Sequence, residues 1–417
     1  MVKTKLIPYC KPSGSSCTPV DSFDVQYKEN TCPQKPPNQW IDTDNKCSND
    51  PSTTPLVINV YYPSNHDYSA CPLPAVILFH AGGYTECSSY TNAGIVAISQ
   101  GLASRGFVVF DVNYRVGVIA DPSPVMPVGV PSFITYTAAQ QWLAIYRGLQ
   151  DARGAIRSII KMSEHHIYDG SYKIDENKIF LAGASAGSVL SLAAAYYGNQ
   201  SKIDTVFPNV SSSLGSIDPD NVYYANTSDL SFDYHTKIIG VLNCWGSLVI
   251  PAIAGYFNDP HSFFSSQGYT LPPIISFQGK LDSTFNFKYQ GVYFAPSGTG
   301  LYGINYHQEN RCLVNSYVAP LPIVIHKNPI PNLILIGSKT IYEMLTNNAS
   351  HIYIPSELYL DCQMAHGLDC DYTDPGCTIP FQSDFGTGLT NDAAVYDYIC
   401  GRAATFFSLL WVILQIC

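Results

Sequence analysis

Charged residues are scarce in this chain. Asp, Glu, Lys and Arg make up only 13% of the 417 residues, whereas 46% are hydrophobic. This composition is typical of a well-packed globular protein and excludes a largely disordered one. Clusters of Lys and Arg are also missing, and the formal net charge is -10. Because phosphate groups bind to positive patches, these features argue against a nucleic-acid partner.

Neither end of the chain carries a long hydrophobic run. The start, MVKTKLIPYCKPSG, has no apolar signal-peptide core, because Pro8 and Cys10 interrupt it. The end, TFFSLLWVILQIC (405–417), is apolar over about a dozen residues, below the ~18 expected of a membrane-spanning helix. We favour a last helix packed on the core. The alternative is a cleaved lipid-anchor signal, which would attach the protein to a membrane surface.

The paired C-x-x-C spacing of a zinc site is absent as well, although there are 13 cysteines. They lie in irregular stretches rich in Pro, Ser and Asn, a pattern that predicts disulfides and a secreted or extracellular protein. Either a secretory signal lies outside this sequence, or the prediction of a secreted protein is wrong. An odd count leaves at least one thiol free or paired between chains, and Cys417 is a candidate. Glycosylation sequons give weak support for secretion; they begin at Asn199, Asn209, Asn226 and Asn348.

The chain divides into two parts. Residues 1–54 are rich in turn-forming residues and hold four cysteines, so we expect a disulfide-tied extension with little regular structure. Residues 55–417 form one domain in which short apolar strands alternate with helix-like stretches such as 137–162. This alternation predicts an α/β fold with a mostly parallel central sheet and helices on both faces. The expected strands are 56–63, 74–83, 106–115, 178–184, 237–246, 273–282 and 357–366.

One serine stands where an expected strand meets an expected helix. Ser185 lies in GASAG (183–187), which matches the pattern G-x-S-x-G. On its own, this pattern is equally typical of close packing. A sharp strand-to-helix turn, however, strains the backbone of the serine and brings strand and helix so close that small neighbours are required. The helix dipole favours negative charge at that point. The setting therefore indicates a nucleophile.

The other parts of a serine nucleophile's machinery follow other expected strands. Gly82 and Gly83, in LFHAGGY, could aim backbone amides at an oxyanion, with Ala186 as a further amide donor. Asp282 and His366 follow later strands and suit the carboxylate and the base of a catalytic triad. Such a mechanism requires neither metal nor organic cofactor.

The chain resembles α/β-hydrolases, in which the triad also has the order Ser, Asp, His. Within that fold it resembles carboxylesterases of the hormone-sensitive-lipase, feruloyl-esterase and acetyl-xylan-esterase type. The likeness runs from about residue 55 to about residue 407. It rests on HAGG (80–83), DVNYR (111–115), QDARGAIRSI (150–159), GKLDSTF (279–285) and AHG (365–367). The resemblance implies an ester hydrolase with Ser185, His366 and Asp282 as its triad, acting on a short acyl, aromatic or polysaccharide-linked ester.

The segment 285–332, rich in Tyr, Gly and Pro, looks like an insertion into this pattern. It begins beside Asp282, so it suits a lid or a wall of the substrate cleft. The extension 1–54 is likewise outside the likeness. Both segments bear on the size of the substrate and leave the core chemistry unchanged.

Several other residues compete for catalytic roles. We expect His80 to brace its loop, Asp111 and Arg115 to form a structural ion pair or brace under the oxyanion loop, and Cys87 to staple that loop. The remaining competitors are expected in caps, surface turns or the cleft wall; they are His165, His166, His307, His326, His351, Asp361 and Asp369. Two other functions stay open: a catalytically silent extracellular structural or adhesion module, and a serine peptidase of the same fold.

Overall fold

The structure is a computed structural model of the chain. It describes residues 2–8, 57–64, 66–69, 71–84, 93–115, 136–164, 172–218, 234–251, 269–279, 282, 289–291, 293–294, 301–302, 333–346, 354–361 and 392–416.

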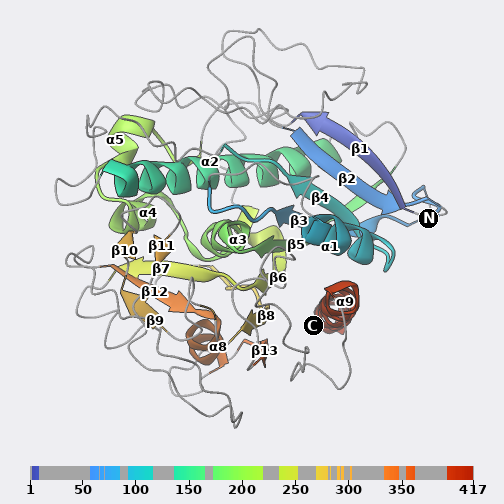
Figure 1. Ribbon diagram of the computed structural model, residues 1–417. Helices are drawn as coiled ribbons and strands as arrows, with labels where there is room; N and C mark the ends of the chain where they lie inside the picture. The colour runs from blue at the N-terminus through green and yellow to red at the C-terminus, as the bar shows by residue number, and fades with distance from the viewer. Residues whose placement is uncertain are drawn as a thin grey trace, which may run out of the picture.

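A mostly parallel sheet forms the centre of the molecule (Figure 1). Its strands follow the order β1-β2-β4-β3-β5-β6-β8-β13. They are β1 (Val2–Pro8), β2 (Val57–Pro63), β3 (Leu73–Phe79), β4 (Val108–Val112), β5 (Ile174–Ala184), β6 (Ile238–Cys244), β8 (Ile274–Gly279) and β13 (Glu357–Asp361). The pairs β1–β2 and β2–β4 are antiparallel, and the other pairs are parallel. The strands from 57 onward coincide with the strands expected from the sequence.

Helices cover both faces of this sheet. Helices α1 (Ala93–Ala103) and α9 (Asp392–Ile416) pack together on one face, and α2 (Tyr136–Glu164) and α3 (Ala186–Tyr196) lie on the other. Strand β3 shows why: its buried side chains alternate between the two faces, so Ile77 and Phe79 join the core under α2 while Val76 and Leu78 join the core under α1 and α9. The predicted α/β-hydrolase fold is confirmed.

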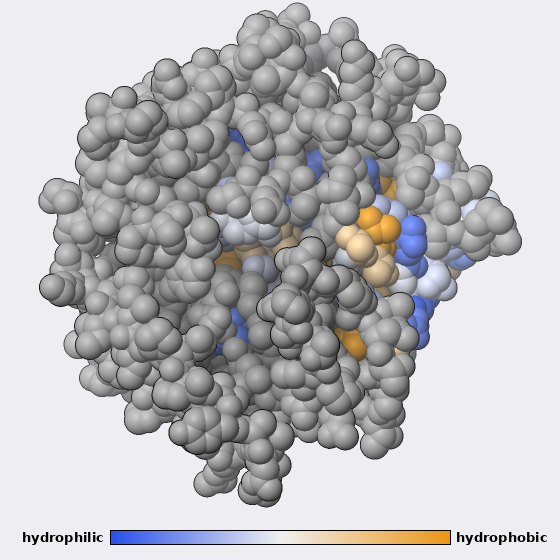
Figure 2. Space-filling view, viewed as in Figure 1, coloured by the Kyte–Doolittle hydropathy of each residue, from blue (hydrophilic) through white to orange (hydrophobic). Residues whose placement is uncertain are grey.

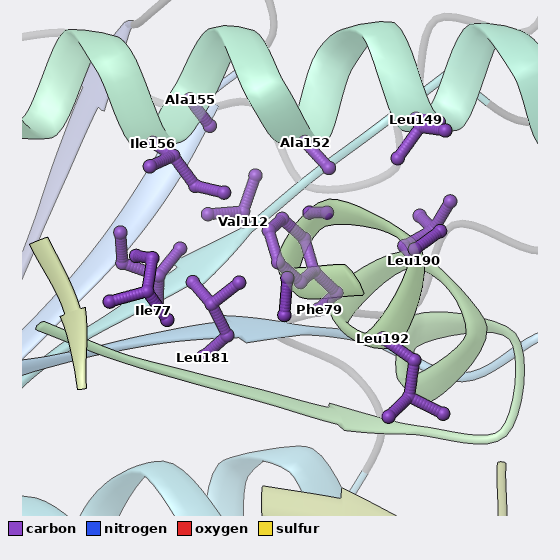
Figure 3. Close-up of a cluster of buried hydrophobic side chains, with 14 of the residues drawn as sticks. Ile77, Phe79, Val112, Leu149, Ala152, Ala155, Ile156, Leu181, Leu190 and Leu192 are labelled. Atoms are coloured by element: carbon purple, nitrogen blue, oxygen red, sulfur yellow. The ribbon is translucent and has the colours of Figure 1, made fainter. Parts of the chain in front are cut away.

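The larger core lies between α2 and the sheet (Figure 3). Leu149, Ala152 and Ile156 recur at helical spacing on the face of α2 that meets the strands, and each is fully buried. Leu190 of α3 packs beside them. Apolar packing therefore fixes α2 and α3 over the sheet. It also fixes the position of the first turn of α3.

A second, smaller sheet extends the molecule beyond β6. It has the antiparallel order β7-β12-β9, with β7 at Ser247–Pro251, β12 at Leu333–Gly337 and β9 at Tyr289–Gly291. Neither β7 nor β12 was predicted from the sequence. The described part of the expected insertion thus contributes β9, paired to β12, and a two-stranded ribbon of β10 (Tyr293–Phe294) and β11 (Leu301–Tyr302). The remainder of 285–332 lies outside the described residues.

Short helices complete the described elements. They are α4 (Gln200–Val206), α5 (Val210–Leu214), the 3-10 helix η3 (Tyr234–Lys237) and α8 (Ser338–Thr346). Helix α8 follows β12 directly and contacts β8 and β13. Its first residue, Ser338, is therefore brought beside the end of β8.

The first residues of the chain depart from expectation. Residues 2–8 form β1, which pairs along its whole length with β2 as an edge strand of the central sheet. The sequence VKTKLIP contains two lysines, which edge strands commonly carry. A strand so close to the chain end was missed because its stability comes from the partner strand. The rest of the expected extension, 9–54, lies outside the described residues.

The C-terminal segment is a helix packed against the sheet. Along α9, Val395, Ile399, Ala403 and Phe407 are buried at intervals of one turn, and the ring of Phe407 stacks on that of Phe180 with centroids 3.9 Å apart.

None of the helices in the described ranges is long and apolar enough to cross a membrane. Leu409 of α9 is 53% exposed. On the face shown in Figure 2, the described hydrophobic residues appear as small patches among hydrophilic ones.

Three cysteines fall within the described residues. Cys71 is exposed, Cys244 and Cys400 are buried, and all three are free thiols. The other cysteines, including Cys87 and Cys417, lie outside the described ranges, so the predicted disulfides remain predictions.

Candidate active site

Ser185 occupies a sharp turn between β5 and α3. Its backbone has φ 52° and ψ -119°, a positive-φ conformation that costs a non-glycine residue about 1–3 kcal/mol. Its amide donates a hydrogen bond to the Cys244 carbonyl oxygen (3.0 Å), and its own carbonyl accepts from Val189 (3.1 Å). The serine is 9% exposed. The strained residue is thus held between the neighbouring strand and the helix that begins immediately after it.

The two glycines of GASAG are required by backbone contacts. A Cβ on Gly183 would lie 2.2 Å from the Gly187 carbonyl oxygen, and a Cβ on Gly187 would lie 2.0 Å from the carbonyl oxygen of Phe79. Both contacts are with backbone, which cannot rotate away. The small residues around Ser185 therefore let the strand, the turn and the helix approach one another this closely.

The loop after β3 lies beside this turn, because Phe79 and Gly183 are partners in the register of β3 and β5. Gly82 and Gly83 have φ values of 121° and 59°, which side-chain-bearing residues rarely adopt. Tyr84, also at positive φ (64°), is buried, and its hydroxyl donates to the carbonyl oxygen of Ala186 (3.1 Å). The loop is thereby joined to the first turn of α3.

Ala186 is the first residue of α3. Amides in the first turn of a helix have no acceptor within the helix, and the helix dipole makes them favourable partners for negative charge. The three amides predicted to bind an oxyanion, those of Gly82, Gly83 and Ala186, thus come from two segments joined by the Tyr84 hydrogen bond. Tyr84 itself was not singled out from the sequence.

His80 supports this loop. Its ring stacks on that of Tyr114 (centroids 4.1 Å apart, 11° between planes), and the Tyr114 hydroxyl donates to the His80 carbonyl oxygen (2.8 Å). The His80 Nδ1 lies 2.6 Å from the carbonyl oxygen of Ala81. Burial lowers the pKa of His80 to about 4, so the imidazole is neutral near pH 7. These contacts suit a brace, the role expected of His80.

Asp282 follows β8 and is 3% exposed. Its amide donates to the Gly279 carbonyl oxygen (3.3 Å), and its carboxylate Oδ2 accepts a hydrogen bond from Gln278 Nε2 (2.5 Å). Strands β5, β6 and β8 are parallel neighbours, so Ser185 and Asp282 follow strands that end at the same edge of the sheet.

His366 lies outside the described residues, as do His165, His166, His307, His326, His351 and Asp369. The strand before His366 is described, however. β13 pairs in parallel with β8, with Asp361 opposite Gly279. Strand β13 therefore ends at the same edge of the sheet as β5 and β8, which Ser185 and Asp282 follow.

Asp111 and Arg115 do not pair with each other. The Arg115 guanidinium forms an ion pair with Asp151 of α2 (2.9 Å), and the Arg115 amide donates to the same carboxylate (2.7 Å). Asp111 accepts from Asn59 (3.3 Å). Of the two expected arrangements, an ion pair or a hydrogen-bonded brace, the ion pair between these two residues does not form. Each residue instead has its own polar partner, because α2 supplies a buried carboxylate that the sequence pattern did not associate with Arg115.

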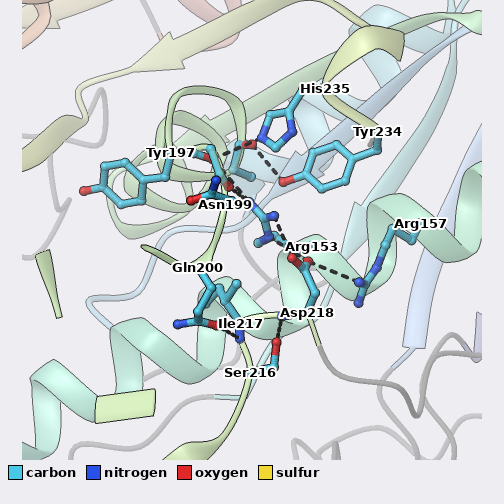
Figure 4. A network of polar contacts seen from close by, with 12 residues as sticks. Arg153, Arg157, Tyr197, Asn199, Gln200, Ser216, Ile217, Asp218, Tyr234 and His235 are labelled. Atoms are coloured by element: carbon cyan, nitrogen blue, oxygen red, sulfur yellow. Dashed lines mark hydrogen bonds and ion pairs between the residues drawn. The ribbon is translucent and has the colours of Figure 1, made fainter. Parts of the chain in front are cut away.

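A buried polar cluster holds the opposite end of α3 (Figure 4). The Arg153 guanidinium donates two hydrogen bonds to the Asp218 carboxylate (both 2.8 Å). It also donates to the carbonyl oxygen of Tyr197, the C-cap of α3. Arg157 also pairs with Asp218 (3.1 Å). These contacts involve the last turn of α3, so they anchor the end of the helix that lies away from Ser185. Within the described residues there is no group of acidic, His and Cys side chains that could hold a metal ion.

Comparisons with known proteins give distant similarities. No family model matches the chain, and no curated protein matches it. Among solved structures, Thermogutta terrifontis esterase 2 phosphonylated by cyclosarin is similar with a TM-score of 0.45 and 15% identity, over 86% of this chain and 90% of that chain. Its apo form has a TM-score of 0.45 and 16% identity, over 88% and 92%. The propionate-bound form has a TM-score of 0.44 and 16% identity, over 86% and 91%. Similarity at this level does not identify a substrate for this chain.

Proposed function

We propose that the protein is a serine hydrolase that cleaves carboxylic esters. The observation that supports this most directly is the backbone of Ser185: a strained serine stands at the start of a helix, between two glycines that backbone contacts require. Strain of 1–3 kcal/mol, in order of magnitude, persists where surrounding structure enforces it, and such sites are commonly functional. A serine needed only for packing would have no reason to occupy this conformation.

In the proposed reaction the Ser185 hydroxyl attacks the ester carbonyl while His366 takes its proton and Asp282 orients the imidazole. The amides of Gly82, Gly83 and Ala186 stabilise the oxyanion; removal of one such donor can cost about 2.7–4 kcal/mol of barrier. His366 then protonates the leaving alcohol, and water releases the acyl group by the reverse sequence. No metal or organic cofactor takes part.

The substrate belongs to the same proposal. We expect a short acyl or aromatic ester, including one that decorates a polysaccharide. A serine peptidase of the same fold and a silent structural module are the competing functions. Panels of ester and peptide substrates distinguish the esterase from the peptidase, because the two reactions use the same nucleophile and differ in the leaving group.

The decisive experiment is labelling with a fluorophosphonate probe. The wild-type protein should be labelled on Ser185, and Ser185→Ala should abolish labelling. Ser191→Ala is a matched control, because Ser191 is buried in the same helix and its hydroxyl donates to the Ser188 carbonyl oxygen (3.0 Å). It should keep wild-type labelling. A well-folded wild-type protein that is not labelled would favour the structural module.

Secretion is a separate proposal, supported by the cysteine count and by two sequon asparagines, Asn199 and Asn209, that are exposed at helix starts. Expression through a eukaryotic secretory pathway should yield a glycoprotein whose mass falls on deglycosylation. The lipid-anchor alternative for the tail would give a product that lacks the end of α9.

A further inference from the structure

A buried row of polar side chains leads to Asp282. Asn243 of β6 donates from Nδ2 to Ser338 Oγ at the start of α8 (2.9 Å), and Ser338 Oγ donates to Gln278 Oε1 of β8 (2.8 Å). Gln278 Nε2 then donates to Asp282 Oδ2 (2.5 Å). Each of these side chains is at most 3% exposed. Residues far apart in sequence thus form one connected row inside the fold.

The direction of the hydrogen bonds in this row is determined at its first residue. The backbone amide of Gly246 can only donate, and it faces Asn243 Oδ1 at 3.0 Å. The other amide atom of Asn243, Nδ2, must therefore face Ser338 and donate to it. Ser338 has one proton, which is then directed to Gln278 Oε1.

The same direction follows from the other end. An ionised carboxylate only accepts, so Asp282 requires a donor from Gln278. This places Gln278 Oε1 toward Ser338, in agreement with the order imposed by Gly246. Buried polar rows in which every member is satisfied from both ends are strongly specified. A flipped Gln278 amide would leave two acceptors facing each other at Asp282, and a flipped Asn243 amide would leave two donors facing each other at Gly246.

The first residues of the row also pack against α3, the helix that follows Ser185. A Cβ on Gly246 would lie 2.1 Å from the Ser188 Cβ, one turn after Ser185. Ser188 Oγ in turn donates to the Gly183 carbonyl oxygen (2.5 Å) and accepts from the Cys244 amide (3.0 Å). The polar row therefore connects the turn that carries Ser185 with the carboxylate after β8.

We propose that Gln278 is a positioning residue for Asp282, with its amide held in the donating orientation by Ser338 and Asn243. The inference rests on the proposed function. An aspartate that orients a catalytic histidine must present one oxygen to the imidazole, and its plane must be fixed for that purpose. The Gln278 hydrogen bond fixes the plane by holding Oδ2 from inside the protein.

The structure offers a matched pair of serines to test this. Ser276 lies on β8 beside Gln278, is fully buried like Ser338, and accepts from the same Asn243 Nδ2 (3.3 Å). It does not lie between Asn243 and Asp282. Ser338→Ala and Ser276→Ala each remove one buried hydroxyl next to Asn243, but only the first breaks the connection to the carboxylate.

The experiment measures kcat and KM on an ester substrate, the rate of labelling by the fluorophosphonate probe, and the melting temperature. Ser338→Ala and Gln278→Leu should lower kcat and the labelling rate by about 10- to 100-fold with little change in KM, since a misplacement of about 1 Å can cost about 100-fold. Ser276→Ala should have the wild-type kcat and labelling rate. Ser338→Thr should also have wild-type rates, because it retains the hydroxyl. Equal losses in the two alanine variants, or unchanged kcat in Ser338→Ala, would overturn the inference.

A pH profile gives a readout that a purely structural role would not move. In Gln278→Glu, a proton shared between the introduced carboxyl and Asp282 replaces the amide hydrogen bond, so activity should persist near neutral pH. Activity should fall at alkaline pH, when both groups ionise and repel, while the wild type keeps its rate. A variant profile parallel to the wild type contradicts the inference. If wild-type protein is neither active nor labelled, the proposed function itself fails, and this inference fails with it.

Discussion

Gly187 lies so close to Phe79 that a Cβ on the glycine would meet the Phe79 carbonyl oxygen at 2.0 Å. The two residues belong to the first turn of α3 and the end of β3, and their contact sets how near the loop containing Gly82 and Gly83 can come to Ser185. The placement of these amides thus depends on a backbone-to-backbone contact.

Replacement of Gly187 tests this contact. Gly187→Ala should lower the free energy of unfolding by about 1–3 kcal/mol, as overpacked cores do, and should abolish labelling of Ser185, because the helix must move away from β3. Urea unfolding and probe labelling measure the two effects. Gly401→Ala is the control: it lies within α9, and its nearest neighbour would be the far end of Arg105 at 3.9 Å. It should be neutral or stabilising by up to about 1 kcal/mol. Wild-type labelling in Gly187→Ala would contradict the argument.

The Tyr84 hydroxyl joins the loop that holds Gly82 and Gly83 to the first turn of α3. Tyr84→Phe should destabilise the protein by about 0.5–1.5 kcal/mol and also lower kcat, because the loop loses its hydrogen bond to Ala186. Tyr234→Phe removes an equally buried hydroxyl that donates to the Ala194 carbonyl near the other end of α3 (2.9 Å). It should cost similar stability and leave kcat unchanged. Parallel losses of kcat would refute a specific role for Tyr84.

Asp111 should make stability depend on pH. Burial raises its pKa to about 8, and the hydrogen bond from Asn59 offsets only part of that effect. Between pH 4 and 8, by order of magnitude, the folded protein holds a proton that the unfolded chain releases, so the free energy of unfolding falls as pH rises through this range and levels off above it. Asp111→Asn should flatten that dependence. Urea titrations at several pH values measure it, and an unchanged slope in the variant would exclude Asp111 as the cause.

The ion pair between Arg115 and Asp151 is expected to matter for stability. Asp151→Ala leaves a buried guanidinium without its carboxylate and should lower the free energy of unfolding by about 3–5 kcal/mol. Asp397 provides the contrast, since its side chain is 71% exposed and pairs with Arg105 at the surface (2.6 Å). Asp397→Ala should change stability by about 0–1 kcal/mol. Comparable effects in the two variants would contradict this distinction, which denaturant unfolding can measure.

Much of the fold could be predicted from local sequence. Continuous apolar runs marked the strands of the central sheet from β2 onward, and GASAG marked the turn at Ser185, because hydrophobic periodicity and small-residue requirements are local properties. Strand β1 and the sheet of β7, β12 and β9 were missed. Their pairing joins segments such as 2–8 and 57–63, or 247–251 and 333–337, whose partners no local pattern reveals.

The candidate site divides in the same way. The sequence by itself determined the chemistry offered: a serine between glycines, a glycine loop after a strand, and an aspartate after another strand. Only the tertiary structure decided which side chains support them. Gln278 and Ser338 lie 60 residues apart and Asn243 and Ser338 lie 95 apart, yet they form one hydrogen-bonded row. Hydrogen bonds of this kind depend on atoms being within about 3 Å in a dry interior, and that proximity arises only when the sheet and α8 are packed together.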